Sequence, residues 1–356
     1  MDAKAINALL GRENITLSKA MQLIDANANG ILFIVDEHRK LLGCLTDGDI
    51  RRFLLAGGKM EEKVLAAVNS NPKVAYSLDE AAKLYHNKNY VVIPVLDAEG
   101  VIVDFFNGDR KALVKRGSLN IPVVINAGGK GTRLEPFTKV LPKPLIPVGE
   151  LPIIELIMNE YQTYDCNEFH IIVNYKRDLM KAYFADIERH YNITWYDEEK
   201  PLGTGGGLSL LRGRFESTFF FANCDALLTA NYERMLEFHK EHENVITMVC
   251  AYKHLTIPYG IVDMGLNGKI EGMKEKPQLS FLTNTGIYIV EPEIVNDIEN
   301  DQMISFPEII EMERQKGKKV AVFPVSENDW MDMGQFSELE KMKLKLYGEE
   351  ECWRRL

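Results

Sequence analysis

Apolar and polar positions follow the same pattern twice in the first third of the chain. The two segments begin at Ile31 and Val91, an offset of 60 positions, and read ILFIVDEHRKLLGCLTDGDIRR and VVIPVLDAEGVIVDFFNGDRKA. Each has an apolar run, a polar turn, a second apolar run and a Gly-Asp pair that opens a basic helix. A stretch with helical periodicity precedes each segment, over 17–28 and 78–88. The pattern predicts two successive β-α-β-β-α repeats.

Beyond a short polar linker at 117–120, apolar strands alternate with amphipathic helices. The clearest strands read FHIIVNY, STFFFANCD, VITMVCAY, TNTGIYIV and KKVAVFPV, and the clearest helices read LPIIELIMNEYQTYD, DLMKAYFADIERHY and YERMLEFHKEHE. This alternation predicts an α/β domain with a doubly wound sheet. We therefore expect one domain over residues 1–118, with repeats over about 1–58 and 59–118, and a second over 122–356.

Composition excludes several classes of protein. The 356 residues are 46% hydrophobic and 26% charged, as in ordinary globular domains, and no apolar run approaches the roughly 18 residues that span a bilayer. The start of the chain lacks the apolar core of a secretory signal, and the five cysteines form no CxxC pair, so we expect a cytoplasmic protein without a membrane segment. A net charge of −10 argues against nucleic-acid binding.

The charge is unevenly distributed. The first 120 residues carry 16 Lys and Arg against 15 Asp and Glu, which leaves 26 against 37 for the remainder. Any phosphate chemistry in the second domain must therefore rely on a few placed cations or on a metal ion.

The segment VVINAGGKGTRLEPFTKVLPKPLIPVG supplies such cations. A buried strand breaks at Gly128 and Gly129, with Gly131 close behind, and glycines let successive backbone N–H groups surround a phosphate. Arg133 and Lys143 add two positive charges, which suits a triphosphate. The spacing matches neither a GxxxxGK[ST] P-loop nor a GxGxxG dinucleotide turn.

This segment resembles the N-terminal signature of sugar-1-phosphate nucleotidyltransferases, which join a nucleoside triphosphate to a sugar 1-phosphate and release pyrophosphate. The resemblance continues to about Gly334 and implies a Rossmann-like, glycosyltransferase-A-like mixed sheet. The segment PLGTGGG, from Pro201 to Gly207, resembles a PLGTAGA loop that lies against the base, so its extra glycines make it either more mobile or more closely packed. The nucleotide-binding residues implied by the resemblance are Ala127, Gly128, Gly129, Gly131, Thr132, Arg133, Lys143, Pro201, Gly203 and Thr204.

Asp225 follows an apolar strand, at the end where ligands of open α/β sheets bind. It resembles the carboxylate of the family's Gly-Asp pair, with Cys224 in place of the glycine. The later WMDMG segment resembles a motif that supplies a second carboxylate, Asp332. The resemblance implies that these two acids hold Mg²⁺, although either could instead cap a helix or lie on the surface.

The resemblance also implies a sugar-phosphate site. In the EKP segment Glu275 would accept from sugar hydroxyls and Lys276 would hold the phosphate, while Asn284 would contact the sugar. Tyr259 and Gly260 resemble a pair at the rim of the sugar site, and Gly286 would permit close approach of the backbone. The residues expected to serve catalysis are Arg133, Lys143, Asp225, Lys276 and Asp332.

The repeats in the first domain resemble a pair of CBS motifs, a regulatory module that often binds adenine nucleotides. In such motifs a Thr or Ser and an Asp three positions later hold ribose and phosphate, and the first repeat supplies Thr46 and Asp49. The second repeat has Phe106 in place of the hydroxyl residue, although Asp109 remains. Thr46 and Asp49 could equally cap the helix that follows them.

Together the resemblances imply an enzyme that transfers a nucleoside monophosphate to a hexose 1-phosphate. The PLGT-type loop favours GTP, with UTP, CTP, dTTP and ATP as alternatives. A CBS pair ahead of this domain also resembles bacterial enzymes that make GDP-glucosamine for legionaminic acid, so we expect an amino- or manno-type sugar. A homo-oligomer with an adenine nucleotide effector is expected, and a catalytically silent nucleotide-sensing subunit stays an alternative.

Overall fold

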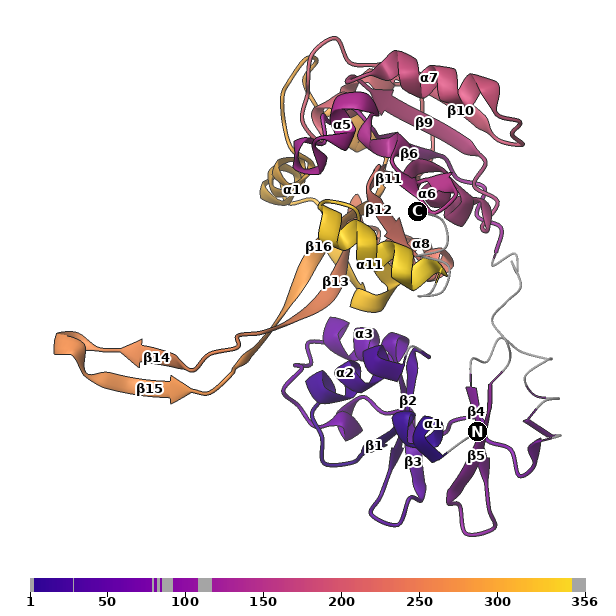
Figure 1. Cartoon of the computed structure of the whole chain (residues 1–356), viewed down its shortest axis with the longest axis vertical. Helices are drawn as coiled ribbons and strands as arrows, with labels where there is room; N and C mark the ends of the chain where they lie inside the picture. The colour runs from indigo at the N-terminus through magenta and orange to yellow at the C-terminus, as the bar shows by residue number, and fades with distance from the viewer. Residues whose placement is uncertain are drawn as a thin grey trace. The chain divides into compact units, whose positions relative to one another are not determined.

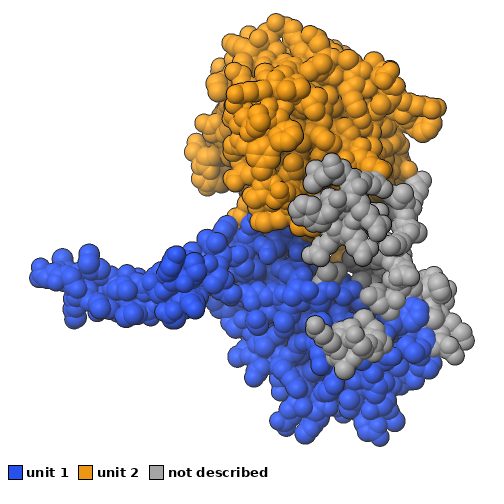
Figure 2. All heavy atoms as spheres, in the orientation of Figure 1, with its two compact units in different colours: residues 1–112, 252–281, 325–328 blue, residues 113–251, 282–324, 329–356 orange. Residues whose placement is uncertain are grey.

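The computed structural model describes residues 3–27, 29–78, 80, 81, 84, 92–107 and 117–347. The chain divides into two compact units, coloured blue and orange in Figure 2. Unit 1 comprises residues 1–112, 252–281 and 325–328, and unit 2 comprises 113–251, 282–324 and 329–356. None of the helices in the described part of the chain has both the length and the apolar character that crossing a bilayer requires.

The first predicted repeat forms the centre of unit 1 (Figure 1). Its sheet has the order β1-β2-β3, in which β1 is parallel to β2 and β2 is antiparallel to β3. Apolar side chains of α2, including Leu17 and Ile24, are buried against Leu32 and Leu45 of the strands. The elements are α1 (Ala3–Ala8), β1 (Leu10–Arg12), α2 (Leu17–Asn27), β2 (Ile31–Val35), β3 (Leu41–Thr46), α3 (Asp47–Leu55) and η1 (Val64–Ala66).

The two strands of the second repeat are also present. β4 (Val92–Leu96) and β5 (Ile102–Asn107) pair antiparallel, with a register shift one residue before the end of β4, as β2 and β3 have at the end of β2. The described residues thus confirm the strand–turn–strand part of both repeats. The predicted helix over 78–88 falls largely outside the described residues, and Asp109 lies outside them.

Unit 1 also contains a hairpin made of β14 (Ile261–Met264) and β15 (Ile270–Lys274), with η5 (Leu266–Gly268) at its turn (Figure 1). The predicted Tyr259, Gly260, Glu275 and Lys276 lie at the base of this hairpin.

Unit 2 is built on a seven-stranded sheet with the order β10-β9-β6-β11-β16-β13-β17. The first four strands are parallel, and β16 is antiparallel to β11, so the sheet is mixed as predicted. The strands are β6 (Val123–Asn126), β9 (Glu168–Val173), β10 (Asn192–Asp197), β11 (Phe219–Asn223), β13 (Ile246–Thr256), β16 (Gln278–Val290) and β17 (Val320–Ser326). Short pairs are formed by β7 (Pro147–Val148) with β8 (Leu151–Pro152) and by β12 (Ala226–Leu228) with β18 (Trp330–Asp332).

Helices cover this sheet because their apolar faces are buried against it. They are α5 (Phe137–Val140), α6 (Ile153–Gln162), α7 (Arg177–Asp186), α8 (Tyr232–Glu241), α9 (Glu293–Asn296), α10 (Phe306–Gln315) and α11 (Phe336–Tyr347), with 3-10 turns η2 (Thr132–Leu134), η3 (Lys143–Leu145), η4 (Gly206–Leu211) and η6 (Glu327–Asp329).

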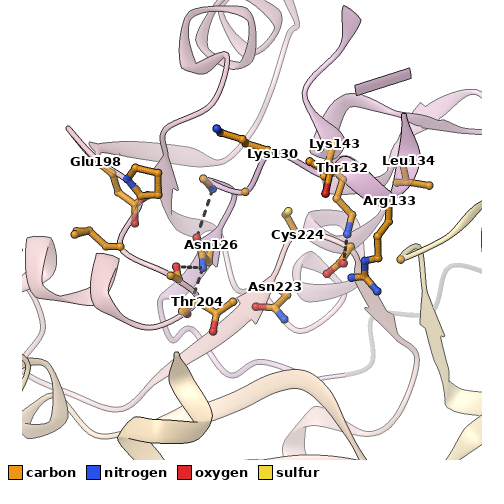
Figure 3. A pocket seen from close by; sticks show the side chains of 18 residues that line it. Asn126, Lys130, Thr132, Arg133, Leu134, Lys143, Glu198, Thr204, Asn223 and Cys224 are labelled. Carbon is orange, nitrogen blue, oxygen red and sulfur yellow. Dashed lines mark hydrogen bonds and ion pairs between the residues drawn. The ribbon is translucent and has the colours of Figure 1, made fainter. Parts of the chain in front are cut away.

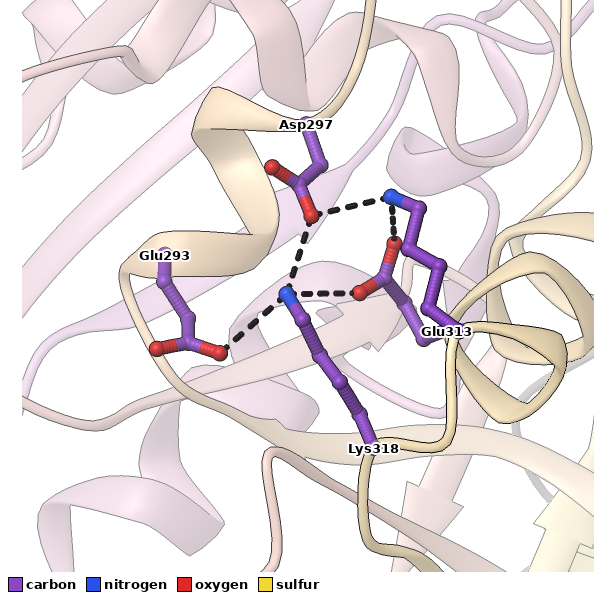
Figure 4. A network of polar contacts seen from close by, with 5 residues as sticks. Glu293, Asp297, Glu313 and Lys318 are labelled. Carbon is purple, nitrogen blue, oxygen red and sulfur yellow. Dashed lines mark hydrogen bonds and ion pairs between the residues drawn. The ribbon is translucent and has the colours of Figure 1, made fainter.

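Helix α10 is fixed at both ends. At its start Ser305 and Glu308 form a capping box, and the ring centroid of Phe306 lies 4.2 Å from that of Tyr288 on β16. Near its other end the buried carboxylate of Glu313 forms ion pairs with Lys316 at 2.7 Å and with Lys318 at 2.8 Å (Figure 4). Lys318 also forms an ion pair with Glu293 of α9, and both lysines pair with Asp297, the residue that follows α9. This network anchors α10, and the first turn of this helix contacts the PLGTGGG loop at Thr204.

Candidate active site

A cavity of about 570 Å³ lies in unit 2 at the carboxyl ends of β6 and β11 (Figure 3). This is the edge of an α/β sheet where ligands bind, and the volume is within the range of small-molecule sites. All the predicted nucleotide-binding residues line it except Ala127, which is buried behind the first glycine. The lining residues are Asn126, Gly128, Gly129, Lys130, Gly131, Thr132, Arg133, Leu134, Lys143, Glu198, Pro201, Leu202, Gly203, Thr204, Asn223, Cys224, Asp225 and Gly334.

The glycine-rich turn places two cations at this cavity. Gly131 has φ of +65°, and a Cβ there would lie 2.9 Å from Cβ of Lys143, so only glycine lets the turn pass this close to the lysine. The hydroxyl of Thr138 donates to the carbonyl of Gly131 at 3.1 Å and holds the turn. Arg133 follows in η2 and is exposed at the cavity, whereas Lys143 is buried, with a relative exposure of 8%.

The two predicted metal-binding acids come together through β12 and β18. Ala226 is in register with Asp332, and the backbone N–H of Met333 donates to the carbonyl of Asp225 at 2.9 Å. Lys143 forms an ion pair with the carboxylate of Asp225. Burial and the nearby charge of Asp225 raise the pKa of Asp332, although Lys143 and Arg133 oppose the shift. Two acids from distant segments therefore share one site, beside the cations Lys143 and Arg133.

These acids fit a divalent cation. A bound cation relieves the repulsion between two carboxylates that raises the pKa of one of them. Hard cations such as Mg²⁺ also prefer carboxylate oxygens. Two carboxylates are a small ligand set, and the described residues contain no cluster of three or more His, Cys, Asp or Glu side chains suited to a metal. A metal bound here would draw its remaining ligands from water or phosphate.

Cys224 also lines the cavity. Its thiol is buried, and burial together with the charge of Asp225 raises its pKa to about 12. The thiol is therefore protonated at neutral pH.

Two asparagines that the sequence analysis did not identify line the cavity, and one of them connects its parts. Asn126 and Asn223 end the neighbouring strands β6 and β11, directly paired in register. The side-chain amide of Asn126 donates to the carbonyls of Gly203 and Thr204 at 3.4 and 3.2 Å, and its oxygen accepts from the backbone N–H of Gly128 (Figure 3). Asn126 thus joins the glycine-rich turn to the PLGT loop. Their position at the carboxyl ends of adjacent strands was the signal that could have revealed both.

The PLGT loop is closely packed, which decides between the two expectations for its glycines. The glycines that replace the two alanines are Gly205 and Gly207. A Cβ on Gly205 would lie 2.9 Å from the backbone nitrogen of Phe306, and one on Gly207 would lie 2.8 Å from Cγ2 of Ile172. The hydroxyl of Thr204 accepts from the backbone N–H of Phe306 at 3.1 Å, at the start of α10. The loop is therefore fixed in place by the first turn of that helix.

Glu198 is the other residue that sequence reasoning missed. It lines the cavity with 3% relative exposure, and its Oε1 is buried with no hydrogen-bond partner in the described part of the chain. A Cβ on Gly128 would lie 2.7 Å from one carboxylate oxygen, and a Cβ on Gly207 would lie 2.6 Å from the other. Burial raises the pKa of Glu198 to about 7. Its position directly before the PLGT loop was the available signal, and the glycines on both sides leave room for its carboxylate.

The amino acids predicted to contact the sugar phosphate fall into two groups. Asn284 and Gly286 lie on β16 in unit 2, where Gly286 has φ of +78° and a Cβ would lie 2.5 Å from Nδ2 of Asn223. Gly286 therefore brings β16 against a residue of the cavity. The amide of Asn284 donates to the hydroxyl of Tyr288 at 2.7 Å.

The other amino acids predicted to contact the sugar phosphate belong to unit 1. A Cβ on Gly260 would lie 2.8 Å from the carboxylate of Glu275, so the hairpin brings these two residues together, while Tyr259 and Lys276 are exposed. Their roles stay predictions.

Thr46 and Asp49 form the helix cap that the sequence left open as an alternative. The hydroxyl of Thr46 accepts from the backbone N–H of Asp49 at 3.3 Å, and the carboxylate of Asp49 accepts from the backbone N–H of Thr46 at 2.9 Å. Arg52 pairs with the same carboxylate. A capping role does not exclude ligand binding, so the nucleotide interpretation stays a prediction.

Comparison with known proteins places this geometry in a family. Residues 122–348 match the model of the nucleotidyl transferase family, and residues 12–56 match that of the CBS domain. Mannose-1-phosphate guanyltransferase from Aspergillus oryzae is 34% identical over 226 residues, and its counterpart from Saccharomyces cerevisiae is 31% identical over 225 residues. Each alignment covers 60% of this chain and about 60% of the relative, so the chain spans less than two thirds of the relatives' length.

The crystal structure of HddC from Yersinia pseudotuberculosis has a similar fold, with a TM-score of 0.50, 23% identity, and coverage of 63% of this chain and 99% of HddC. The family model matches most of the chain and includes the glycine-rich turn, the two acids and the PLGT loop. The chain belongs to the nucleotidyl transferase family, with a CBS domain ahead of the transferase domain.

Proposed function

We propose that the chain transfers a guanylyl group from GTP to a hexose 1-phosphate of the mannose or glucosamine type, giving a GDP-sugar and pyrophosphate. Relatives named mannose-1-phosphate guanyltransferase support this, although they share only about 60% of their length with the chain. A role in bacterial glycan or legionaminic acid biosynthesis rests on the resemblance in sequence alone.

The observation that carries the choice of guanine is the carboxylate of Glu198. An ionised carboxylate is only a hydrogen-bond acceptor, and its Oε1 has no partner at the cavity wall. Guanine alone among the common bases presents two adjacent donors, N1–H and the N2 amino group, on its pairing edge. Binding another base would leave Oε1 of the buried carboxylate unpaired, which disfavours that base strongly.

The cations of the glycine-rich turn would act on the triphosphate. An oxygen of the sugar phosphate attacks the α-phosphorus of GTP, the bond to the bridging oxygen breaks, and pyrophosphate leaves with that oxygen. Arg133 and Lys143 offset the negative charge on the phosphates, and Asp225 holds the ammonium of Lys143 in place. No protein nucleophile is required, because positioning and charge neutralisation provide most of the catalysis in such transfers.

Asp225 and Asp332 would hold Mg²⁺ in this scheme. When bound, the ion would neutralise phosphate charge and orient the reacting groups. The remaining sugar and phosphate contacts are assigned to residues at the base of the hairpin and on β16: Tyr259, Gly260, Glu275, Lys276, Asn284 and Gly286.

Regulation forms a second part of the proposal. An adenine nucleotide bound near Thr46 and Asp49 would alter transferase activity, with a coupling free energy of about 1–3 kcal/mol if it follows other allosteric proteins. A homo-oligomer, as CBS pairs often form, belongs to this part of the proposal.

The test is to measure pyrophosphate release with GTP, UTP, CTP, dTTP and ATP against mannose, glucosamine and glucose 1-phosphates. We expect GTP with one of the first two sugars to give the highest kcat/KM. A preference for another nucleotide would refute the role given to Glu198. Inactivity with every pair in the presence of Mg²⁺ would favour a catalytically silent nucleotide-sensing subunit.

A further inference from the structure

A second cavity lies within unit 1 and has no part in the proposed reaction. Its volume is about 250 Å³. The walls come from α1, from the edge strand β1, from the end of β2 and from the turn that follows β2. They are formed by Asn7, Leu10, Gly11, Arg12, Val35 and Arg39.

This cavity is at the opposite end of the sheet from Thr46 and Asp49. Arg12 is paired with Val35 at the carboxyl end of β2, whereas Thr46 is paired with Ile31 at the start of that strand. A ligand in the cavity would therefore occupy a different place from a nucleotide held by Thr46 and Asp49.

The polar lining is positively charged. The lining residues include two arginines and no acidic residue. Within the described part of the chain, neither Arg12 nor Arg39 forms an ion pair. The guanidinium of Arg12 donates to the backbone carbonyl of Asp36, and that of Arg39 donates to the side-chain oxygen of Asn7 at 3.4 Å. Because a guanidinium carries five N–H donors, both arginines retain donors for a ligand.

Arg39 shows two further features of a binding residue. Its Nε is buried and has no hydrogen-bond partner among the described residues, and buried donors in proteins are nearly always paired. Its backbone has φ of +66°, a conformation that is strained for arginine and that asparagine or glycine adopts more easily. The turn is held rigidly, since the carboxylate of Asp36 accepts from the backbone N–H groups of His38 and Lys40, both at 2.9 Å.

The opposite strand pair also holds this turn. The backbone N–H of Ile102 donates to the carbonyl of Arg39 at 3.3 Å, and Lys40 forms a bridge with Val101. The turn therefore keeps the Arg39 side chain at the cavity despite the strained backbone. Local strain of this kind is common at ligand sites.

We propose that this cavity binds the phosphate group of a small metabolite, with Arg12 and Arg39 as the donors. Planar guanidinium groups match the oxygens of phosphate in paired hydrogen bonds. Leu10 and Val35 provide an apolar wall for any carbon-containing part of the ligand. The ligand is either a free phosphate or pyrophosphate ion or a phosphate ester, and the experiment distinguishes these sources.

The test is isothermal titration of the full chain with inorganic phosphate, pyrophosphate, AMP and mannose 1-phosphate. The main variant is Arg39→Asn, because asparagine removes the guanidinium but tolerates the positive φ. A second variant, Arg12→Gln, changes an exposed side chain on the edge strand. Lys40→Gln is the matched control, since it removes the same charge from the neighbouring, exposed position.

We expect at least one probe to bind, and both arginine variants to weaken that binding at least tenfold, while Lys40→Gln changes it less than twofold. Equal affinity for free ions and esters identifies the anion itself as the ligand, and tighter binding of an ester identifies a phosphorylated metabolite. Three results would overturn the proposal: no binding heat for any probe at millimolar concentration, an equal loss in the Lys40 variant, or binding that both arginine variants retain. The last result would assign the heat to the cavity of unit 2.

Discussion

Replacing Glu198 with glutamine tests the basis of the proposed guanine selectivity. The two side chains have the same shape, so Glu198→Gln fits between Gly128 and Gly207 without a steric change. It removes a negative charge from a side chain that is only 3% exposed, and it replaces one acceptor with a donor. The substitution should therefore raise the stability of the protein and lower its activity with GTP.

The effect on stability follows from the pKa. Burial raises the pKa of Glu198 from 4.5 to about 7, so the unfolded chain loses this proton at lower pH than the folded one. Between these values the unfolded state binds fewer protons, and the free energy of unfolding falls as pH rises. At about 1.4 kcal/mol per pKa unit, the loss is roughly 3 kcal/mol above pH 7. Without nucleotide, Glu198→Gln should thus be about 2–3 kcal/mol more stable than the parent protein at pH 8 and nearly equal to it at pH 4.5.

The effect on activity runs the other way. A hydrogen bond to a charged group contributes about 1.5–3 kcal/mol, so kcat/KM for GTP should fall roughly 10- to 100-fold. An amide offers one donor and one acceptor, which complement the O4 and N3–H of uracil, so relative activity with UTP should rise. In the parent protein, kcat/KM for GTP should increase as pH rises through about 7 and Glu198 ionises.

Urea denaturation at pH 4.5 and 8, with pyrophosphate release for GTP and UTP, measures both effects. The matched control is Glu199→Gln, because the side chain of Glu199 is 85% exposed and pairs with Arg177 only at 3.8 Å. The control should change stability by less than about 0.5 kcal/mol and leave the base preference unchanged. A Glu198→Gln protein that keeps its GTP preference and gains no stability at pH 8 would refute this reasoning.

Three further substitutions test other parts of the site. Asp225→Asn should lower kcat by on the order of 100-fold or more, because it removes the partner of Lys143 and a proposed metal ligand; an unchanged rate of pyrophosphate release would exclude both roles. Gly206→Ala should destabilise unit 2 by about 2–4 kcal/mol in urea, since its Cβ would lie 2.1 Å from a backbone oxygen, and a neutral result would mean that the loop can shift. Asp49→Ala should lower the stability of unit 1 by about 1 kcal/mol through loss of the capping box, and an unchanged urea midpoint would contradict that contribution.

Local sequence was sufficient for much of the architecture. The repeat at an offset of 60 predicted the paired strands of unit 1, and the alternation after residue 121 predicted the α/β sheet of unit 2, which the family resemblance implied to be mixed. The glycine-rich turn with Arg133 and Lys143 was identified because its spacing is local and its chemistry is evident in one segment. Periodicity and turn residues act over a few positions, so a single sequence reveals them directly.

One local feature stayed open in the sequence. The sequence could not decide whether Thr46 and Asp49 cap a helix, because that depends on where α3 begins.

The amino-acid order by itself determined the family, the two kinds of domain and the glycine-rich turn with its cations Arg133 and Lys143. Only tertiary structure decided that Glu198 is buried beside the PLGT loop, with Oε1 unpaired among the described residues, and that Asp225 and Asp332 share a site. The physical reason is that charge and hydrogen bonding of a side chain depend on what surrounds it. For these residues the surroundings are β6, η4 and β18, which are far apart in the chain and meet only when the sheet forms.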